Sequence, residues 1–201
     1  MAPGLLALLA VCLVACLSPL RSLAFDNGML RRPPMGFRSW EFVGIKVDEA
    51  EMLAAIAALA KKRDGLDGLE DGVSLVDLGY TDVAIDDGWQ PVGQCHHVPG
   101  AVHAGFHRAD GSPIIDRTRF PGGMEAMAES ARAHSLTFSW YTNNCGCAEG
   151  GYTDPQEIDG HYRGDIDAMA RWSATGLKVD GCSQFNNMTR YQELLEARRE
   201  R

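Results

Sequence analysis

The sequence predicts an α/β fold with a parallel sheet. Short apolar or β-branched segments alternate with longer segments whose apolar residues recur at helical spacing, in the order strand then helix, four times in succession. The connections between successive strands have the length of the helical crossovers that parallel strands require. Polar side chains also gather where each expected strand ends. These three observations indicate a series of βα units.

The first two units follow from local composition. Segment 35–40 (MGFRSW) is short and aromatic, and segment 48–64 is rich in alanine with acidic residues in its first turn. Segment 81–89 is a short β-branched run that ends in two acids. Segment 120–134 starts with proline and glycine and then takes helical spacing. We expect strand, helix, strand and helix in that order.

The last two units are equally regular. Segment 136–142 (LTFSWYT) is typical of a strand. Segment 163–176 is typical of a helix, and Gly176 is its expected C-cap. Segment 177–182 (LKVDGC) predicts the fourth strand, and 188–201 a charged terminal helix.

Four strand ends carry groups suited to a site. The carboxyl ends of parallel strands share one face, and sites of α/β folds lie there. Each acid alone is better explained as a helix N-cap or a turn residue, but four consecutive strand ends predict a site. The side chains are Trp40, then Asp86 and Asp87, then Tyr141 with Asn143 and Asn144, and finally Asp180.

Composition limits the class of protein. A chain of 201 residues that is 45% hydrophobic can form one ordinary domain. Its net charge of −8 disfavours nucleic acid as a partner and favours a neutral substrate. Beyond the N-terminus no apolar run is long enough to predict a membrane span.

The N-terminus resembles a secretory signal peptide. An apolar stretch from Leu5 to Leu17 precedes the small residues Ser22 and Ala24, which predicts cleavage after Ala24 and a mature chain 25–201. Because no Lys or Arg precedes the apolar stretch, an N-terminal anchor helix is the competing interpretation. We therefore expect the protein to enter the secretory pathway and to be either secreted or delivered to the lysosome or vacuole.

Cleavage would leave an even number of cysteines. In a secreted chain this predicts two disulfides, whose pairing the sequence alone leaves open among three possibilities. Asn187 begins an N-glycosylation sequon, which agrees with secretion. The four cysteines are Cys95, Cys145, Cys147 and Cys182.

Two long loops invite a metal interpretation. Segment 64–75 is rich in Gly and Asp but lacks the spaced ligands and final Glu of a calcium loop. Segment 91–116 contains His96, His97, His103 and His107 without a zinc-site spacing, so a solvated loop is favoured. We expect neither a metal nor a cofactor.

Four motifs in order resemble glycoside hydrolase family 27, the melibiase or α-galactosidase family. PPMGFRSW is similar to the family's PPMGWNSW, and DLGYTDVAIDDGWQ to its GYxYxxIDDCW. ADGSPIIDRTRFPGGMEAMAESARAHSLTFSWY follows its DGxLxxDxxRFPxGxxxLxxxxHxxGLxxGxY, and WSATGLKVDGC its WGVDYLKxDxC. The resemblance extends from about residue 33 to 185.

The resemblance implies a (β/α)8 TIM barrel, of which this chain holds about the first four βα units, and retaining hydrolysis of terminal α-D-galactosyl residues. Asp180 would be the nucleophile, with Lys178 binding sugar hydroxyls and holding the neighbouring carboxylate ionised. Asp86 and Asp87 would accept hydrogen bonds from the sugar. Trp40 would form an apolar wall, and Tyr141 matches a substrate contact. A homodimer is implied for the full-length enzyme.

The sequence also departs from the family pattern. The family's Trp-Asn is Phe37-Arg38 here, and the Cys of its DDCW is Gly88. The family pattern pairs Cys147 with Cys182 across neighbouring strand ends. Cys95 and Cys145 remain, and a second bridge between them is a hypothesis.

The family's general acid/base lies on a later strand that this chain does not contain. We therefore expect a fragment of a longer enzyme, with two open sheet edges and no glycosidase turnover of its own. α-N-Acetylgalactosaminidase is an alternative within the same fold, and a non-catalytic secreted galactose-binding protein is an alternative of another class. A redox or zinc protein built on Cys145 and Cys147 is disfavoured, because C-x-C lacks CxxC spacing and a second ligand pair.

Overall fold

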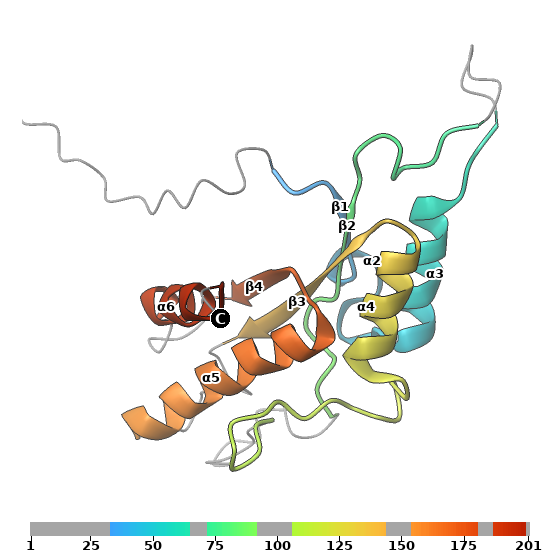
Figure 1. Ribbon diagram of the computed structural model, residues 1–201. Coiled ribbons are helices and arrows are strands. Elements are labelled where there is room, and N and C mark those ends of the chain that lie inside the picture. The colour runs from blue at the N-terminus through green and yellow to red at the C-terminus, as the bar shows by residue number, and fades with distance from the viewer. Residues whose placement is uncertain (1–32, 65–71, 92–105, 144–153, 181–186, 200–201) are drawn as a thin grey trace, which may run out of the picture. The chain divides into compact units, whose positions relative to one another are not determined.

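A four-stranded parallel sheet organises the chain (Figure 1). The computed structural model describes residues 33–64, 72–91, 106–143, 154–180 and 187–199, and all elements given below belong to one compact unit that starts at Pro34. The strands lie in chain order, β1-β2-β3-β4, so the expected α/β class and parallel sheet are confirmed. Their bounds are Gly36–Arg38, Asp82–Ala84, Thr137–Asn143 and Gly176–Asp180.

The register gives the sheet one apolar and one polar face. Phe37 pairs with Val83 and Val83 with Phe138, so these apolar side chains form one row on the same face. Arg38 pairs with Ala84 and Ala84 with Ser139, which places them on the opposite face. Val83, Phe138 and Trp140 are buried in the core with side chains of three helices. These helices are α3 (Glu49–Ala60), α4 (Gly123–Ala133) and α5 (Pro155–Trp172).

Helix α3 has a defined start and a buried stripe. The Asp48 side chain accepts a hydrogen bond from the Glu51 amide at 2.8 Å, as an N-cap does. Met52, Ile56 and Leu59 recur at helical spacing and are buried. The helix ends at Ala60, four residues before the expected end at residue 64.

Helix α5 starts earlier than predicted and stops without the predicted cap. Its first residue is Pro155, not residue 163, and Asp154 caps it by accepting from the Gln156 amide at 2.9 Å. The expected C-cap at Gly176 is wrong. Ser173 closes the helix with a φ of 57°, and Gly176 begins β4, where a Cβ would lie 2.4 Å from the Ser139 hydroxyl oxygen.

Two short helices follow β1 that the sequence did not predict. They are α2 (Trp40–Val43) and the 3-10 helix η1 (Gly44–Lys46). The backbone of η1 packs closely on Gly88, whose φ is +108° and whose missing Cβ would lie 2.7 Å from the Ile45 carbonyl oxygen. A cysteine side chain at position 88 would clash with this backbone, which gives a physical reason for the glycine that stands there.

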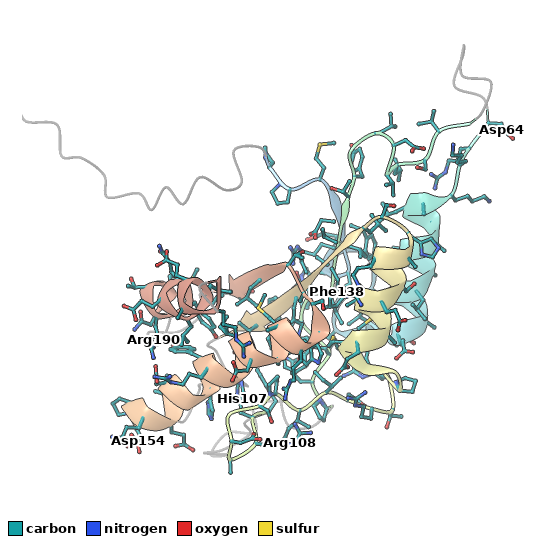
Figure 2. All side chains as sticks on the ribbon, viewed as in Figure 1. Asp64, His107, Arg108, Phe138, Asp154 and Arg190 are labelled. Atoms are coloured by element: carbon teal, nitrogen blue, oxygen red, sulfur yellow. The ribbon has the colours of Figure 1, made fainter. Side chains whose placement is uncertain are left out.

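The long loop before α4 is only partly solvated, contrary to expectation. His107 is buried, and its Nε2 lies 2.8 Å from Asp165 Oδ1 in α5. The hydroxyl of Tyr191, in helix α6 (Met188–Arg199), donates to Asp165 Oδ2 at 3.0 Å. Figure 2 places His107 beside α5. His96, His97 and His103 lie outside the described residues.

The other loop with a metal interpretation is described only at its two ends. Arg63 and Val73 form an antiparallel bridge, while residues 65–71 lie outside the described part. In the described ranges no helix combines the length and the apolar character that a membrane crossing needs.

Helix α6 is tied to α5 by a charged pair that depends on pH. Arg190 Nε donates to Asp159 Oδ1 at 2.5 Å, and this hydrogen bond, more than the opposing effect of burial, lowers the pKa of the Asp159 carboxyl. Arg163 also donates to Asp159, at 2.7 Å. The stabilisation is therefore complete above the ordinary Asp pKa of about 4 and is lost as the pH falls through the lowered value.

We expect Asp159→Asn to lower the free energy of unfolding near neutral pH by less than about 1 kcal/mol, because the pair is partly exposed and solvent screens it. The difference from the unsubstituted chain should shrink as the pH falls from about 4 toward 2. Urea unfolding at several pH values measures this. Glu129→Gln, on the exposed side of α4, controls for the loss of one carboxylate. A difference that stays constant down to the lowest pH would contradict the assignment.

Candidate active site

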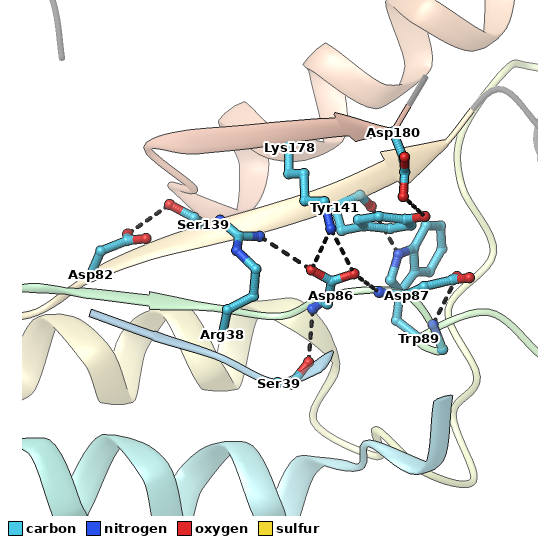
Figure 3. Close-up of polar contacts among 11 residues, drawn as sticks. Arg38, Ser39, Asp82, Asp86, Asp87, Trp89, Ser139, Tyr141, Lys178 and Asp180 are labelled. Carbon is cyan, nitrogen blue, oxygen red and sulfur yellow. Dashed lines mark hydrogen bonds and ion pairs between the residues drawn. The ribbon is translucent and has the colours of Figure 1, made fainter. Parts of the chain in front are cut away.

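The candidate site lies on the polar face of the sheet, toward the carboxyl ends of the strands (Figure 3). In the register, Tyr141 pairs with Lys178, and Asn143 with Asp180, so Lys178 and Asp180 share this face with Tyr141. Asp86 follows β2 on the same side. Four of the predicted site residues are linked by side-chain contacts, in two groups.

Asp86 and Lys178 form the centre of the first group. The Asp86 side chain is 2% exposed, and Lys178 Nζ lies 2.8 Å from its Oδ2 and 3.2 Å from its Oδ1. The Asp87 amide donates to Oδ1 at 2.9 Å, and the Asp86 amide donates to the Ser39 hydroxyl at 2.9 Å. A buried carboxylate needs such partners, because burying an uncompensated charge is costly. The ammonium group expected to act on Asp180 is therefore bonded to Asp86.

Arg38 is a second cation on Asp86 that the sequence did not mark as a site residue. Its Nη1 lies 3.6 Å from Asp86 Oδ2, which is an ion-pair distance but too long for a hydrogen bond. Within the described part of the chain this buried nitrogen has no hydrogen-bond partner. The only sequence signal was the departure of Phe37-Arg38 from the family pattern.

Asp180 and Tyr141 form the second group. The Tyr141 hydroxyl donates to Asp180 Oδ2 at 3.1 Å, and Lys178 Nζ lies 5.0 Å from the centre of the Tyr141 ring. Tyr141 therefore connects the two groups, as Figure 3 shows. Its backbone carbonyl accepts from the indole nitrogen of Trp89 at 2.9 Å, which fixes the strand against the loop after β2.

Asp87 points along the loop after β2, toward Trp89 (Figure 3). Its Oδ1 accepts from the Gly88 amide at 2.9 Å and from Gln90 Nε2 at 2.8 Å. Among the residues that the structure describes, none donates to its Oδ2. Gln90 was not among the predicted site residues, although it directly follows the DDGW motif.

Trp40 is not joined to the other predicted residues. It begins α2, is 43% exposed, and makes no hydrogen bond or ring contact with them in the described part of the chain. Asn187 lies just before α6, is exposed, and its Oδ1 accepts from the Arg190 amide at 3.0 Å. Cys95, Cys145, Cys147 and Cys182 all lie outside the described residues, as do residues 1–32.

Comparison with known proteins bears on the family and the fold. The family described as alpha galactosidase A matches residues 32–199, which is most of the chain. The chain belongs to this glycoside hydrolase family. The resemblance found in the four sequence motifs is thereby confirmed, and with it the assignment of the four βα units to the (β/α)8 barrel class.

Curated relatives of the chain include enzymes from fungi, plants and animals. The alpha-galactosidase of Oryza sativa subsp. japonica is 28% identical over 180 residues, covering 88% of this chain and 37% of the relative. The alpha-N-acetylgalactosaminidase of Mus musculus is 30% identical over 165 residues, covering 80% of this chain and 34% of the relative. Among solved structures, alpha-galactosidase I from Mortierella vinacea matches with a TM-score of 0.61 at 24% identity, covering 86% of this chain and 39% of that one.

The chain is short beside its relatives. It covers 31%, 38% and 35% of three of the relatives that it matches, which is about a third of their length.

Proposed function

We propose that this chain carries part of the active site of a retaining α-galactosidase that acts on terminal α-D-galactosyl residues of oligosaccharides, glycolipids or glycoproteins. The observation that carries the proposal is the arrangement of Asp180 beside Tyr141, next to the Asp86–Lys178 pair, in a member of this family. A neutral sugar needs acceptors and donors for its hydroxyls and an ionised carboxylate that can reach its anomeric carbon.

Asp180 is the proposed nucleophile. Its Oδ2 accepts the hydrogen bond of the Tyr141 hydroxyl at 3.1 Å, which orients the carboxylate. Oδ1 takes no hydrogen bond from any described residue, so it is the oxygen that would attack. Attack would form an ester bond between Oδ1 and the anomeric carbon while the glycosidic bond breaks.

The two acids after β2 are proposed to have different roles. Three hydrogen bonds and the Arg38 charge occupy the carboxylate of Asp86, so it serves mainly to hold Lys178 in place. Asp87 keeps Oδ2 for a sugar hydroxyl. Lys178 has a third N–H beyond the two bonded to Asp86, and this N–H would donate to the sugar.

A second carboxyl group is needed for a complete retaining reaction, at about 5–5.5 Å from the nucleophile. Asp86 is poorly suited to donate a proton to a leaving group, because it is buried and accepts both contacts of the Lys178 ammonium. We therefore propose that the acid/base residue of the whole enzyme lies on another part of the barrel. The secretory route, the cleaved signal peptide, the Cys147–Cys182 bridge and glycosylation of Asn187 also stay proposals.

α-N-Acetylgalactosaminidase is the second candidate. The observation that favours it is that relatives with this name from Gallus gallus and Mus musculus are each 30% identical to the chain.

The expected result for the 201-residue chain is binding of methyl α-D-galactoside without hydrolysis of p-nitrophenyl α-D-galactoside. Asp87→Ala should weaken this binding about tenfold or more, because it removes a charge-assisted hydrogen bond of about 1.5–3 kcal/mol. Isothermal calorimetry measures binding, and release of nitrophenolate measures turnover.

Asp167→Ala is the matched control, since Asp167 is 58% exposed on α5. Methyl α-glucoside and methyl α-N-acetylgalactosaminide test which sugar is preferred. The proposed site would be wrong if neither methyl α-D-galactoside nor methyl α-N-acetylgalactosaminide bound. It would also be wrong if the Asp87→Ala variant bound methyl α-D-galactoside as tightly as the unsubstituted chain. Steady nitrophenolate release lost in Asp180→Asn would show that the acid/base residue is present after all.

A further inference from the structure

Arg38 places a positive charge beneath the proposed sugar site that Asp86 does not fully neutralise. Two cations, Arg38 and Lys178, lie against the single carboxylate of Asp86, at 3.6 Å and 2.8 Å. The three groups together carry one net positive charge. Among the described residues, Arg38 forms an ion pair with no carboxylate other than Asp86.

The neighbours of Arg38 leave room for its long side chain. Arg38 pairs in register with Ala84, Ala84 with Ser139, and Ser139 with Gly176, so the row around it holds only small side chains. Figure 3 shows Arg38 between Ser139 and Asp86. The side chain as a whole remains 35% exposed, while its Nη1 is buried and has no hydrogen-bond partner among the described residues.

Two of the negative charges, Asp180 and Asp87, lie away from this row, whereas the Asp82 carboxylate lies beside it and accepts from the Ser139 hydroxyl at 2.7 Å. Asp180 is four residues further along β4 than Gly176, which corresponds to roughly 13 Å of strand. Asp87 turns toward Gln90 and Trp89 and accepts from Gly88 and Gln90. A negative group placed over Arg38 on the side of Asp86 would therefore meet the guanidinium and the Lys178 ammonium before it met Asp180 or Asp87.

Asp86 also has little capacity left for a hydroxyl donor. Its Oδ1 already accepts from the Asp87 amide and from Lys178, and its Oδ2 accepts from Lys178 and faces Arg38. A ligand group that binds here must accept hydrogen bonds. The guanidinium group offers a rigid fork of N–H donors that matches an oxyanion, whereas a single hydroxyl would use one of them.

We propose that Arg38 is a specificity-determining residue that adapts this site to an acidic sugar, a galactopyranoside that carries an oxyanion substituent such as a uronate carboxylate. This inference rests on the proposed function, because it assumes that the polar face binds a galactose-type ring. The chemistry is shared by a carboxylate and by a sulfate ester, and the planar carboxylate fits the guanidinium fork in the bidentate way.

The test compares the affinity of the 201-residue chain for three methyl α-glycosides: galactoside, galacturonide and a galactoside sulfate ester. We expect about tenfold tighter binding of the galacturonide than of the neutral galactoside at low salt, from one added charge-assisted contact. The preference should shrink as ionic strength rises. Arg38→Gln should reduce the ratio of the affinity for the galacturonide to the affinity for the galactoside to about one or below. Arg38→Lys should keep part of it, and Arg132→Gln, an exposed residue of α4, should leave it unchanged.

Each outcome either supports or overturns the proposed role of Arg38. Equal affinity for the neutral and acidic sugars, or an unchanged ratio in Arg38→Gln, overturns the role of Arg38 and leaves the galactoside site intact. Tighter binding of the sulfate ester than of the galacturonide supports an oxyanion site but overturns the proposal that the oxyanion is a carboxylate. Failure of all three ligands to bind overturns the proposed function itself. If Arg38→Gln does not fold, the salt dependence of the unsubstituted chain and the Arg38→Lys ratio decide in the same way.

Discussion

Asp180→Asn should abolish covalent labelling of the chain by α-galactosyl fluoride. Fluoride leaves with little need for a proton, so the first step of a retaining reaction can proceed without a general acid. Asp180 Oδ1 would form an ester with the anomeric carbon as the carbon–fluorine bond breaks. The second step needs a base to activate water, so the ester should accumulate. We expect about one fluoride released per chain, followed by a stop.

Mass spectrometry of the intact chain and of its peptides measures this labelling. A galactosyl adduct should map to the peptide with Asp180 in the unsubstituted chain and be absent from Asp180→Asn. Tyr141→Phe should label more slowly, because it removes the hydrogen bond that orients Oδ2. Asp159→Asn, on α5, should label normally. An adduct on Asp86 or Asp87, or continued fluoride release after one equivalent, would refute the assignment of Asp180.

The order of the elements was predictable because each strand and helix has its own local signal. β-Branched and aromatic runs mark β2 and β3, and the βα alternation implies a parallel sheet in which sequential strands are neighbours. The start of α5 was missed although Asp154 and Pro155 are strong start signals. Ser173 was missed as a C-cap because a left-handed serine has no sequence signal comparable to that of glycine.

That the predicted side chains share one face of the sheet was predictable, but their pairings were not. Tyr141 and Asp180 share a face because alternation and register place them there, and the sequence contains both. Lys178 was expected to act on Asp180, two residues away, but bonds to Asp86, which is distant in sequence. Such a choice depends on how far each side chain reaches across the sheet. The position of Arg38 over a row of small residues likewise needs the register of all four strands.

The buried cluster around Asp165, on the apolar face of the sheet, is a second set of pairings that the sequence does not predict. Asp165 accepts from the Tyr191 hydroxyl at 3.0 Å, contacts His107 Nε2 at 2.8 Å, and lies 3.4 Å from the Thr142 hydroxyl oxygen. His161 stacks on His107 with ring centres 4.2 Å apart. This one carboxyl therefore joins the loop before α4, strand β3 and helix α6 to α5. No spacing in the sequence predicts it, since its partners come from separate segments.

Asp165→Ala should be among the most destabilising single changes in this chain. It removes a buried carboxyl and leaves the Tyr191 hydroxyl and the His107 ring without this partner in a site closed to water. Breaking a buried charged or hydrogen-bonded group in this way costs about 3–5 kcal/mol. For a domain of this size that corresponds to a melting temperature lower by roughly 10 °C. Thermal unfolding followed by circular dichroism measures the shift.

The graded variants separate a structural anchor from a general loss of packing. Tyr191→Phe removes only the hydroxyl and should cost about 1 kcal/mol, which keeps the test open if Asp165→Ala does not fold. Asp165→Asn keeps an acceptor for the hydroxyl and should cost less than Asp165→Ala. Arg171→Ala, an exposed residue of the same helix, should stay within about 0.5 kcal/mol of the unsubstituted chain. If Asp165→Ala were as stable as Arg171→Ala, the cluster would not help to fasten α6 and the loop to α5.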